Sequence, residues 1–164
     1  MTGNATQTAG EIFARAIAAK DGVALTGILS ETIDFQALTP GKIFAASTNT
    51  EAALELILGT WFAPARIDEL CSVEASNVQR RQHVNYRFRT HLGDDEYLVE
   101  QQAYYDTDGG QITWMRVLCS GYQAVQPARL SARGSRRTGS PSPGWPSLSW
   151  RRCAPRDGWR SSPR

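Results

Sequence analysis

Hydrophobic residues near the start of the chain recur at helical spacing. Thr8-Ala-Gly-Glu11 has the form of a capping box, and the apolar stripe after it predicts a helix. The stripe consists of Ile12, Phe13, Ala16 and Ile17. Asp21-Gly22 interrupts this pattern and can begin a short second helix, which would carry Leu25, Ile28 and Leu29.

A short strand-like segment separates these two helices from a third. Residues 33–38 alternate between apolar and polar side chains, and Thr39-Pro-Gly41 predicts a turn after which residues 42–45 return. Thr48-Asn-Thr-Glu51 is a second capping box. The apolar positions from Ala53 to Trp61 follow helical spacing and predict a third helix.

From Arg66 onward the hydrophobic period changes from helical to two. The pattern predicts four long strands, at residues 67–79, 82–92, 96–105 and 111–122. Turn residues separate the last three of these strands. The order of elements predicts an α+β fold, a cone-shaped curved antiparallel sheet wrapped around three N-terminal helices.

Charge divides the chain of 164 residues into two parts. Residues 1–126 carry nine Lys and Arg against fifteen Asp and Glu, a net charge of −6. Residues 127–164 carry nine Arg against Asp157 alone, a net charge of +8, and hold no Ile, Val, Phe or Tyr. Such a segment cannot bury enough apolar surface to offset its ordering entropy. We therefore expect a folded domain at 1–126 and a disordered Arg/Ser/Pro-rich tail at 127–164.

Two other interpretations of the tail stay open. Its composition is also typical of GC-rich DNA translated out of frame. A basic arm for nucleic acid or an anionic membrane is the functional alternative, because Trp145, Trp150 and Trp159 lie among arginines. Basic composition without a recognisable module is a weak signal, so a nucleic-acid partner is disfavoured and no membrane partner is expected.

The sequence favours a reducing compartment and no cofactor. Residues 1–10 lack the apolar core of a secretory signal, and no apolar run approaches transmembrane length. The three cysteines, Cys71, Cys119 and Cys153, are odd in number and lack metal-site spacing. We therefore expect a cytoplasmic protein. The chain shows no phosphate loop, dinucleotide fingerprint or metal cluster.

Several local patterns within residues 9–123 resemble one superfamily. They are the helix break at Lys20-Asp21, Ile33-Asp-Phe35 before a Pro-Gly turn, the helix end Gly59-Thr-Trp-Phe62, and the hairpin Asp108-Gly-Gly-Gln-Ile112 that continues to Met115-Arg116. Together they resemble the nuclear transport factor 2-like superfamily, and in particular an uncharacterised bacterial branch of its SnoaL-like members. The resemblance implies a polyketide cyclase-like cone with a ligand-binding pocket.

That resemblance implies two alternative functions. The first is a small-molecule-binding domain with an apolar pocket, which acts as a cofactor-free isomerase, cyclase or hydrolase. The second is a non-enzymatic ligand-binding or dimerisation module. A small hydrophobic molecule is the expected partner in the first case, and a homodimer is expected in either.

Ketosteroid isomerase, a member of this superfamily, needs a carboxylate base and an oxyanion hole made by a Tyr and a protonated Asp. Matched by pattern, these three positions are Phe13, Phe35 and Gln101 in this chain. A phenyl ring can neither accept a proton nor donate to an oxyanion, so only Gln101 keeps a donor. A slip of one residue would make Asp34 the base. The candidate catalytic residues are therefore Asp34 and Gln101, although a solvent-facing Asp34 is the commoner case.

Strand alternation predicts which other side chains line the pocket. By analogy with the isomerase, Gln101 faces the inside of the cone, and residues of matching parity join it. The candidate ligand-binding residues are Phe13, Phe35, Tyr86, Phe88, Tyr105, Met115 and Cys119. The alternative is that these side chains simply fill the core, since aromatic stripes at strand spacing are usually buried.

The opposite parity predicts an outer face. Arg87 and Arg89 are expected there, in cross-strand pairs with acidic neighbours, and so are His83 and His91. Trp114, Arg116 and Leu118 would share that face. Because a Trp–Leu pair would otherwise leave an apolar patch in water, we expect a homodimer through the outer face.

Overall fold

The computed structural model describes residues 7–125, and the predicted tail at 127–164 lies outside this range. Two helices come first, α1 (Ala9–Ala19) and α2 (Gly22–Ile28), followed by the strands β1 (Leu29–Thr39) and β2 (Lys42–Thr48). The helix η1 (Glu51–Trp61) comes next. The remaining strands are β3 (Arg66–Val78), β4 (Arg81–Leu92), β5 (Asp95–Asp108), β6 (Gln111–Cys119) and β7 (Gln123–Ala124).

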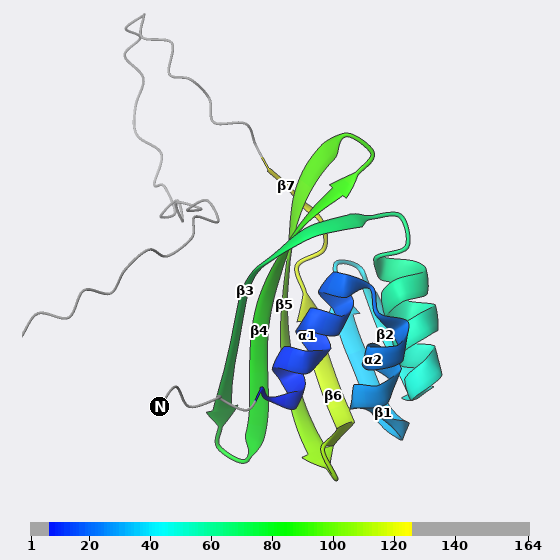
Figure 1. The fold of residues 1–164 in the computed structure, drawn as a ribbon, viewed down its shortest axis with the longest axis vertical. Helices are drawn as coiled ribbons and strands as arrows, with labels where there is room; N and C mark the ends of the chain where they lie inside the picture. The colour runs from blue at the N-terminus through cyan, green and yellow to red at the C-terminus, as the bar shows by residue number, and fades with distance from the viewer. Residues whose placement is uncertain (1–6, 126–164) are drawn as a thin grey trace, which may run out of the picture. The chain divides into compact units, whose positions relative to one another are not determined.

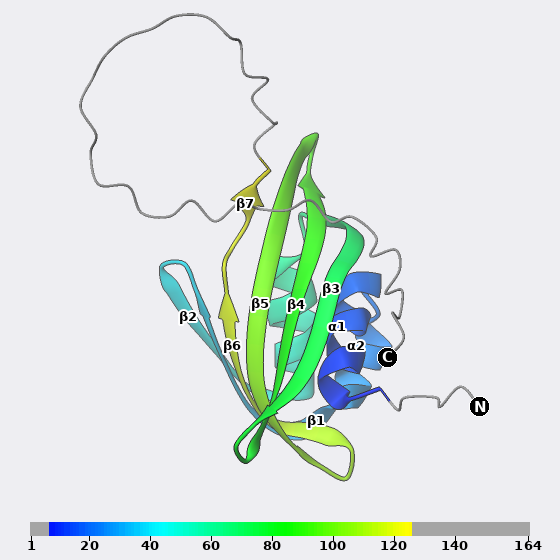
Figure 2. The ribbon, with the colours of Figure 1, turned by 90° about the vertical axis from the view of Figure 1, so that its left-hand side faces the viewer.

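The strands form one curved, open sheet in the order β2-β1-β6-β5-β4-β3, and β7 pairs with β5 beyond the end of β6. All three helices lie on one side of this sheet (Figures 1 and 2). The α+β prediction is therefore confirmed. The closed wrapping of a cone stays a prediction, so we call the side that faces the helices the inner face and the opposite side the outer face.

The expectation of a wholly antiparallel sheet is wrong at one pair of strands. β1 runs parallel to β6, whereas every other pair is antiparallel. A tight hairpin forces its strands to be antiparallel, but β1 and β6 are joined through the rest of the domain, which leaves their direction free. Local sequence patterns predict hairpins, but they do not indicate which distant strands pair with each other.

Both predicted capping boxes are present, but the helices they begin differ. At α1 the Thr8 hydroxyl accepts from the Glu11 N–H, and the Glu11 carboxylate accepts from the Thr8 N–H at 2.7 Å. Glu51 closes the second box with Thr48 in the same way. η1 nevertheless has π-helical hydrogen bonding, which the hydrophobic pattern did not predict. A Cβ at Gly59 would run into the Leu54 carbonyl oxygen, so this wider helix requires glycine there.

The hydrophobic core lies between the helices and the inner face. Gly10 on α1 lets the helix approach β5 closely, because its backbone N–H donates to the Tyr105 hydroxyl at 3.0 Å. A Cβ at Gly10 would stand 2.8 Å from the Tyr105 side chain and from the Cβ of Val84. This contact fixes the start of α1 against the sheet.

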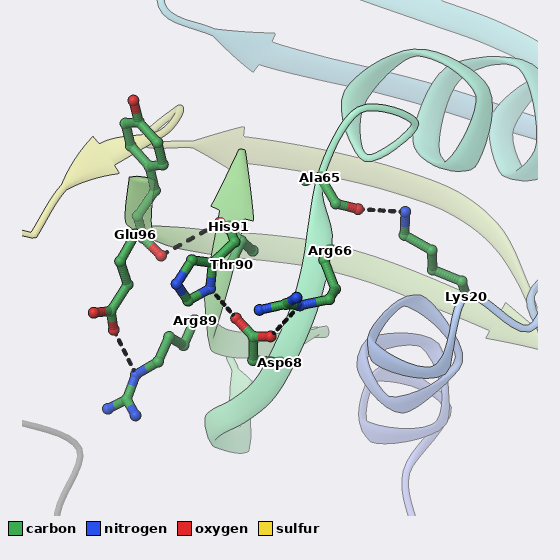
Figure 3. A network of polar contacts seen from close by, with 9 residues as sticks. Lys20, Ala65, Arg66, Asp68, Arg89, Thr90, His91 and Glu96 are labelled. Atoms are coloured by element: carbon green, nitrogen blue, oxygen red, sulfur yellow. Dashed lines mark hydrogen bonds and ion pairs between the residues drawn. The ribbon is translucent and has the colours of Figure 1, made fainter. Parts of the chain in front are cut away.

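Lys20 stabilises the C-terminal end of α1. It caps the helix in a left-handed conformation, with a φ of 51°. Its ammonium group donates to the carbonyl oxygens of Phe62 at 2.6 Å and Ala65 at 2.5 Å, just after the end of η1. Figure 3 shows the second of these contacts. One side chain thus connects α1 to the turn that leads into β3.

We expect Lys20→Met to destabilise the domain. The methionine keeps much of the apolar stem but removes both charge-assisted hydrogen bonds, worth about 1 kcal/mol in total because the residue is exposed. Thermal unfolding should show a midpoint lower by about 3 °C. Arg15→Met, at an exposed position on the same helix, is the control. An equal loss in both variants would contradict the role given to Lys20.

Candidate functional site

The candidate binding residues of the sequence analysis lie together on the inner side of the sheet. Six of the seven are buried in one hydrophobic cluster: Phe13, Phe35, Tyr86, Phe88, Tyr105 and Met115. Cys119 packs against this cluster and is partly exposed. These side chains therefore form a continuous apolar and aromatic interior.

Unbroken strand register places Tyr86, Gln101 and Cys119 in one row. Tyr86 of β4 lies opposite Gln101 of β5, and Gln101 lies opposite Cys119 of β6. Directly opposed side chains on one face of an antiparallel pair stand close enough to touch. We call these three residues the inner polar row.

Two members of the inner polar row are buried without a polar partner. Tyr86 is 0% exposed and Gln101 is 1% exposed. Neither the Tyr86 hydroxyl nor either polar atom of the Gln101 amide has a hydrogen-bond partner within the part of the chain that the structure describes. Burial, followed by the charge that a Cys119 thiolate would carry, raises the pKa of Tyr86 well above its usual range, so its hydroxyl stays protonated.

The other buried polar atoms without a described partner lie in side chains that are not wholly buried. They belong to Trp61, His83 and Asn85, whose side chains each reach the surface in part. Thr90, which like Gln101 is a buried polar residue of the described chain, donates its hydroxyl to the Tyr97 carbonyl oxygen at 3.3 Å. An unpaired buried polar group costs about 1–3 kcal/mol. The inner polar row therefore concentrates an unfavourable free energy at one place in the core.

Tyr105 differs from Tyr86 although both face inward. Its hydroxyl already accepts the hydrogen bond from Gly10, so it supports α1. Phe13 meets Tyr86 edge-on, with 6.2 Å between ring centroids, and Phe88 lies 5.3 Å from Tyr86 on the same strand. The rings of Phe13 and Phe88 thus both pack against the ring of Tyr86.

The structure does not bring Asp34 together with Gln101. Asp34 lies on the outer face, where its carboxylate is 58% exposed and forms an ion pair with Arg116 at 2.7 Å. The hydrogen bond from Arg116 is the main cause that lowers the pKa of Asp34. A lowered pKa makes a carboxylate a weaker base. Its neighbour Phe35 is the residue that faces the core, with 0% exposure.

Asp34 instead borders a shallow hollow of about 440 Å³ over β1, β2 and the start of η1. Glu51 and Glu55 also line this hollow, and sequence reasoning missed them as neighbours of Asp34. Glu51 is already engaged, because it accepts hydrogen bonds from Ser47 and Thr48, which lower its pKa. The capping pattern was the available signal, and it indicates a structural role.

The outward arginines form surface ion pairs, whereas His83 contacts the Ser76 hydroxyl at 3.2 Å. His91 contacts Asp68 at 2.5 Å, and Arg66 holds the same carboxylate at 2.7 Å (Figure 3). The hydrogen bond from His91, then that from Arg66, lowers the pKa of Asp68. Arg87 pairs with Glu100 at 2.8 Å, and Arg89 pairs with Glu69 and Glu96. The expectation of cross-strand charge pairs on the outer face is confirmed.

Two kinds of feature are missing from residues 7–125, a helix able to span a membrane and a side-chain cluster able to hold a metal ion. No helix in this range has the length and hydropathy that a membrane span requires. No group of three or more His, Cys, Asp or Glu side chains in the same range could hold a metal ion.

Comparison with known proteins bears on the fold. The sequence matched no protein-family model and no curated protein. A solved structure of a candidate isomerase from Rhodopseudomonas palustris resembles the chain with a TM-score of 0.57 and 16% identity, over 71% of this chain and 92% of that chain. An LEH-like epoxide hydrolase from M. tuberculosis resembles it with a TM-score of 0.53 and 14% identity, over 68% and 80%.

A candidate polyketide cyclase from Xanthomonas campestris resembles the chain with a TM-score of 0.52 and 17% identity, over 67% of this chain and 86% of that chain. These three solved structures are of the nuclear transport factor 2-like and SnoaL-like type that the sequence resembles. At these identities the likeness establishes the fold alone. The chain has the nuclear transport factor 2-like fold.

We expect Gln101→Leu to stabilise the domain. Leucine has similar bulk and removes two unpaired polar atoms from the core, so the free energy of unfolding should rise by about 1 kcal/mol or more. Thermal melts of protein freed of bound small molecules by unfolding and refolding should show a midpoint higher by about 3 °C or more. Gln102→Leu, at an exposed position of the same strand, should leave it unchanged. A lower midpoint for Gln101→Leu would show that the amide has a structural partner.

Proposed function

We propose that residues 1–126 form a small-molecule-binding domain whose ligand occupies the inner side of the sheet. The observation that carries this proposal is the inner polar row, in which Tyr86 and Gln101 are buried without described partners. Natural cores rarely keep such groups unless a ligand or water satisfies them. A small, flat, hydrophobic molecule with a polar group fits a wall of aromatic rings with two polar positions.

Several considerations support binding as the function ahead of any particular reaction. Gln101 and Thr90 are the buried polar side chains among the described residues, apart from the tyrosines, and neither is a general base at neutral pH. The described carboxylates with a shifted pKa, Asp34, Glu51 and Asp68, all have it lowered. The structural neighbours described as an isomerase, a hydrolase and a cyclase use the same fold. Catalysis by Gln101 with Asp34 stays a hypothesis within this proposal.

The test is binding of prodan, a small neutral naphthalene ketone whose fluorescence shifts to the blue in apolar surroundings. The full chain should bind it saturably, with one site per chain. Gln101→Leu should weaken binding several-fold, because the ketone loses a donor worth about 1 kcal/mol. Gln102→Leu should bind like the parent. If only Gln102→Leu weakens binding, the ligand site is on the outer face and the proposal is wrong.

A second proposal concerns association through the outer face. Ile43, Leu38 and Leu118 lie side by side on β2, β1 and β6, and they are 71%, 49% and 54% exposed. Such an adjacent trio of aliphatic side chains in water favours burial against a second surface. Trp114, expected in this patch, is instead covered by the guanidinium groups of Arg81 at 3.6 Å and Arg116 at 4.5 Å. We therefore centre the proposed homodimer on the aliphatic trio.

This proposal predicts twice the monomer mass in light scattering at micromolar concentration. Leu38→Glu should shift the chain toward monomer, because a twofold interface would bury two such charges. Val23→Glu, on α2 and 85% exposed, is the matched control and should leave the mass unchanged. A monomeric parent chain would contradict the homodimer.

A further inference from the structure

The inner polar row carries information about what it binds. A primary amide offers two N–H donors and a carbonyl acceptor, and the Tyr86 hydroxyl can donate or accept. None of these groups has a partner among the described residues. A ligand that satisfies Gln101 must therefore present an acceptor and a donor side by side. A group with acceptors only would leave the amide oxygen unpaired.

Charge restricts the ligand further. The wholly buried polar groups of the described residues are neutral, since Gln101 carries an amide, Thr90 carries a hydroxyl, and the high pKa of Tyr86 keeps its own hydroxyl protonated. The described arginines nearest in register, Arg87 and Arg116, lie on the outer face and pair there with Glu100 and Asp34. A carboxylate in this interior would lose its hydration without gaining a cation, which is costly.

We propose that Tyr86, Gln101 and Cys119 form a subsite for the polar end of a neutral ligand that carries a hydrogen-bond donor beside an acceptor, with a carboxamide on an aromatic ring as the simplest case. The aromatic ring of such a ligand would lie against Phe13 and Phe88, which flank Tyr86. This inference rests on the proposed binding function and specifies the chemical class of its ligand.

Cys119 provides a reporter for occupancy of the subsite. It is partly exposed, whereas its row neighbours Gln101 and Tyr86 are not. Burial first, and then the charge that a Cys119 thiolate would carry, raises the pKa of Tyr122 to about 12. Tyr122 is half-buried and donates its hydroxyl to the Trp61 carbonyl oxygen at 2.5 Å. Cys119 thus lies at the margin between the core and solvent, because it is partly exposed and packs against the hydrophobic cluster.

The experiment measures protection of Cys119 from iodoacetamide in the full chain, by mass spectrometry of its peptides. Three probes share one ring and differ in the polar group: benzamide has a donor and an acceptor, acetophenone has an acceptor only, and benzoate is an anion. Benzamide should protect Cys119 at about tenfold lower concentration than acetophenone, and benzoate should not protect. Cys71 on β3, also partly exposed, is the internal control and should react equally with every probe.

Variants connect this preference to Gln101. In Gln101→Leu, benzamide and acetophenone should protect within about twofold of each other, whereas Gln102→Leu should keep the tenfold preference. Protection by benzoate equal to that by benzamide would overturn the subsite, and so would a benzamide preference that remains in Gln101→Leu. In either case, saturable prodan binding would still support the proposed function. Absence of both prodan binding and protection would overturn both. If Gln101→Leu does not fold, the ranking of the three probes on the parent chain and on Tyr86→Phe decides the question.

Discussion

The register between β4 and β5 is the constraint on which the rest of the site depends. It runs without a shift from the turn at Gly93 to the pair of Gln82 with Tyr105. Because side chains alternate between faces, a slip of one residue would move every inward side chain to the outer face. Gln101 would then be in water, and Glu100 with its partner Arg87 would be in the core. The ion pairs on the outer face and the aromatic interior thus stabilise the same register from opposite sides.

The same alternation explains why the sequence predicted part of the fold well. Turn residues predict the hairpins, and Gly93, Gly109 and Gly110 have the positive φ angles that tight turns require. Counting along one strand placed Gln101 on the same face as Tyr105, and the resemblance to the isomerase indicated that this face is the inner one. The parallel pairing of β1 with β6 and the π-helical form of η1 depend on contacts between distant segments or on backbone geometry, and no local pattern encodes them. The stacking of Arg81 on Trp114 is equally non-local. Together with Arg116, which is two residues along the same strand, Arg81 covers the Trp114 ring, so this ring adds less exposed apolar surface to the outer face.

Asp34 and Phe35 are the two positions between which the sequence left the assignment of the candidate base open. The two are neighbours on β1, and only the face that each occupies separates a candidate base from a core residue. β1 pairs with both β2 and β6 through a register shift just before these residues. The apolar and polar alternation of residues 33–38 agrees with the observed parity, whereas the pattern match to the isomerase had left a slip of one residue open. In the structure Asp34 forms an ion pair with Arg116 on the outer face, and Phe35 is buried in the core.

The inner polar row differs from the rest of the interior because its buried polar groups without described partners lower the free energy of unfolding. An apolar side chain at Gln101 would pack against Val99 and Ala103 without leaving any group unpaired, and selection for stability alone would favour it. Tyr86 could lose its hydroxyl by the same reasoning. That both polar groups persist on facing strands, with a thiol as the next member of the row, is best explained by a molecule that supplies the missing hydrogen bonds.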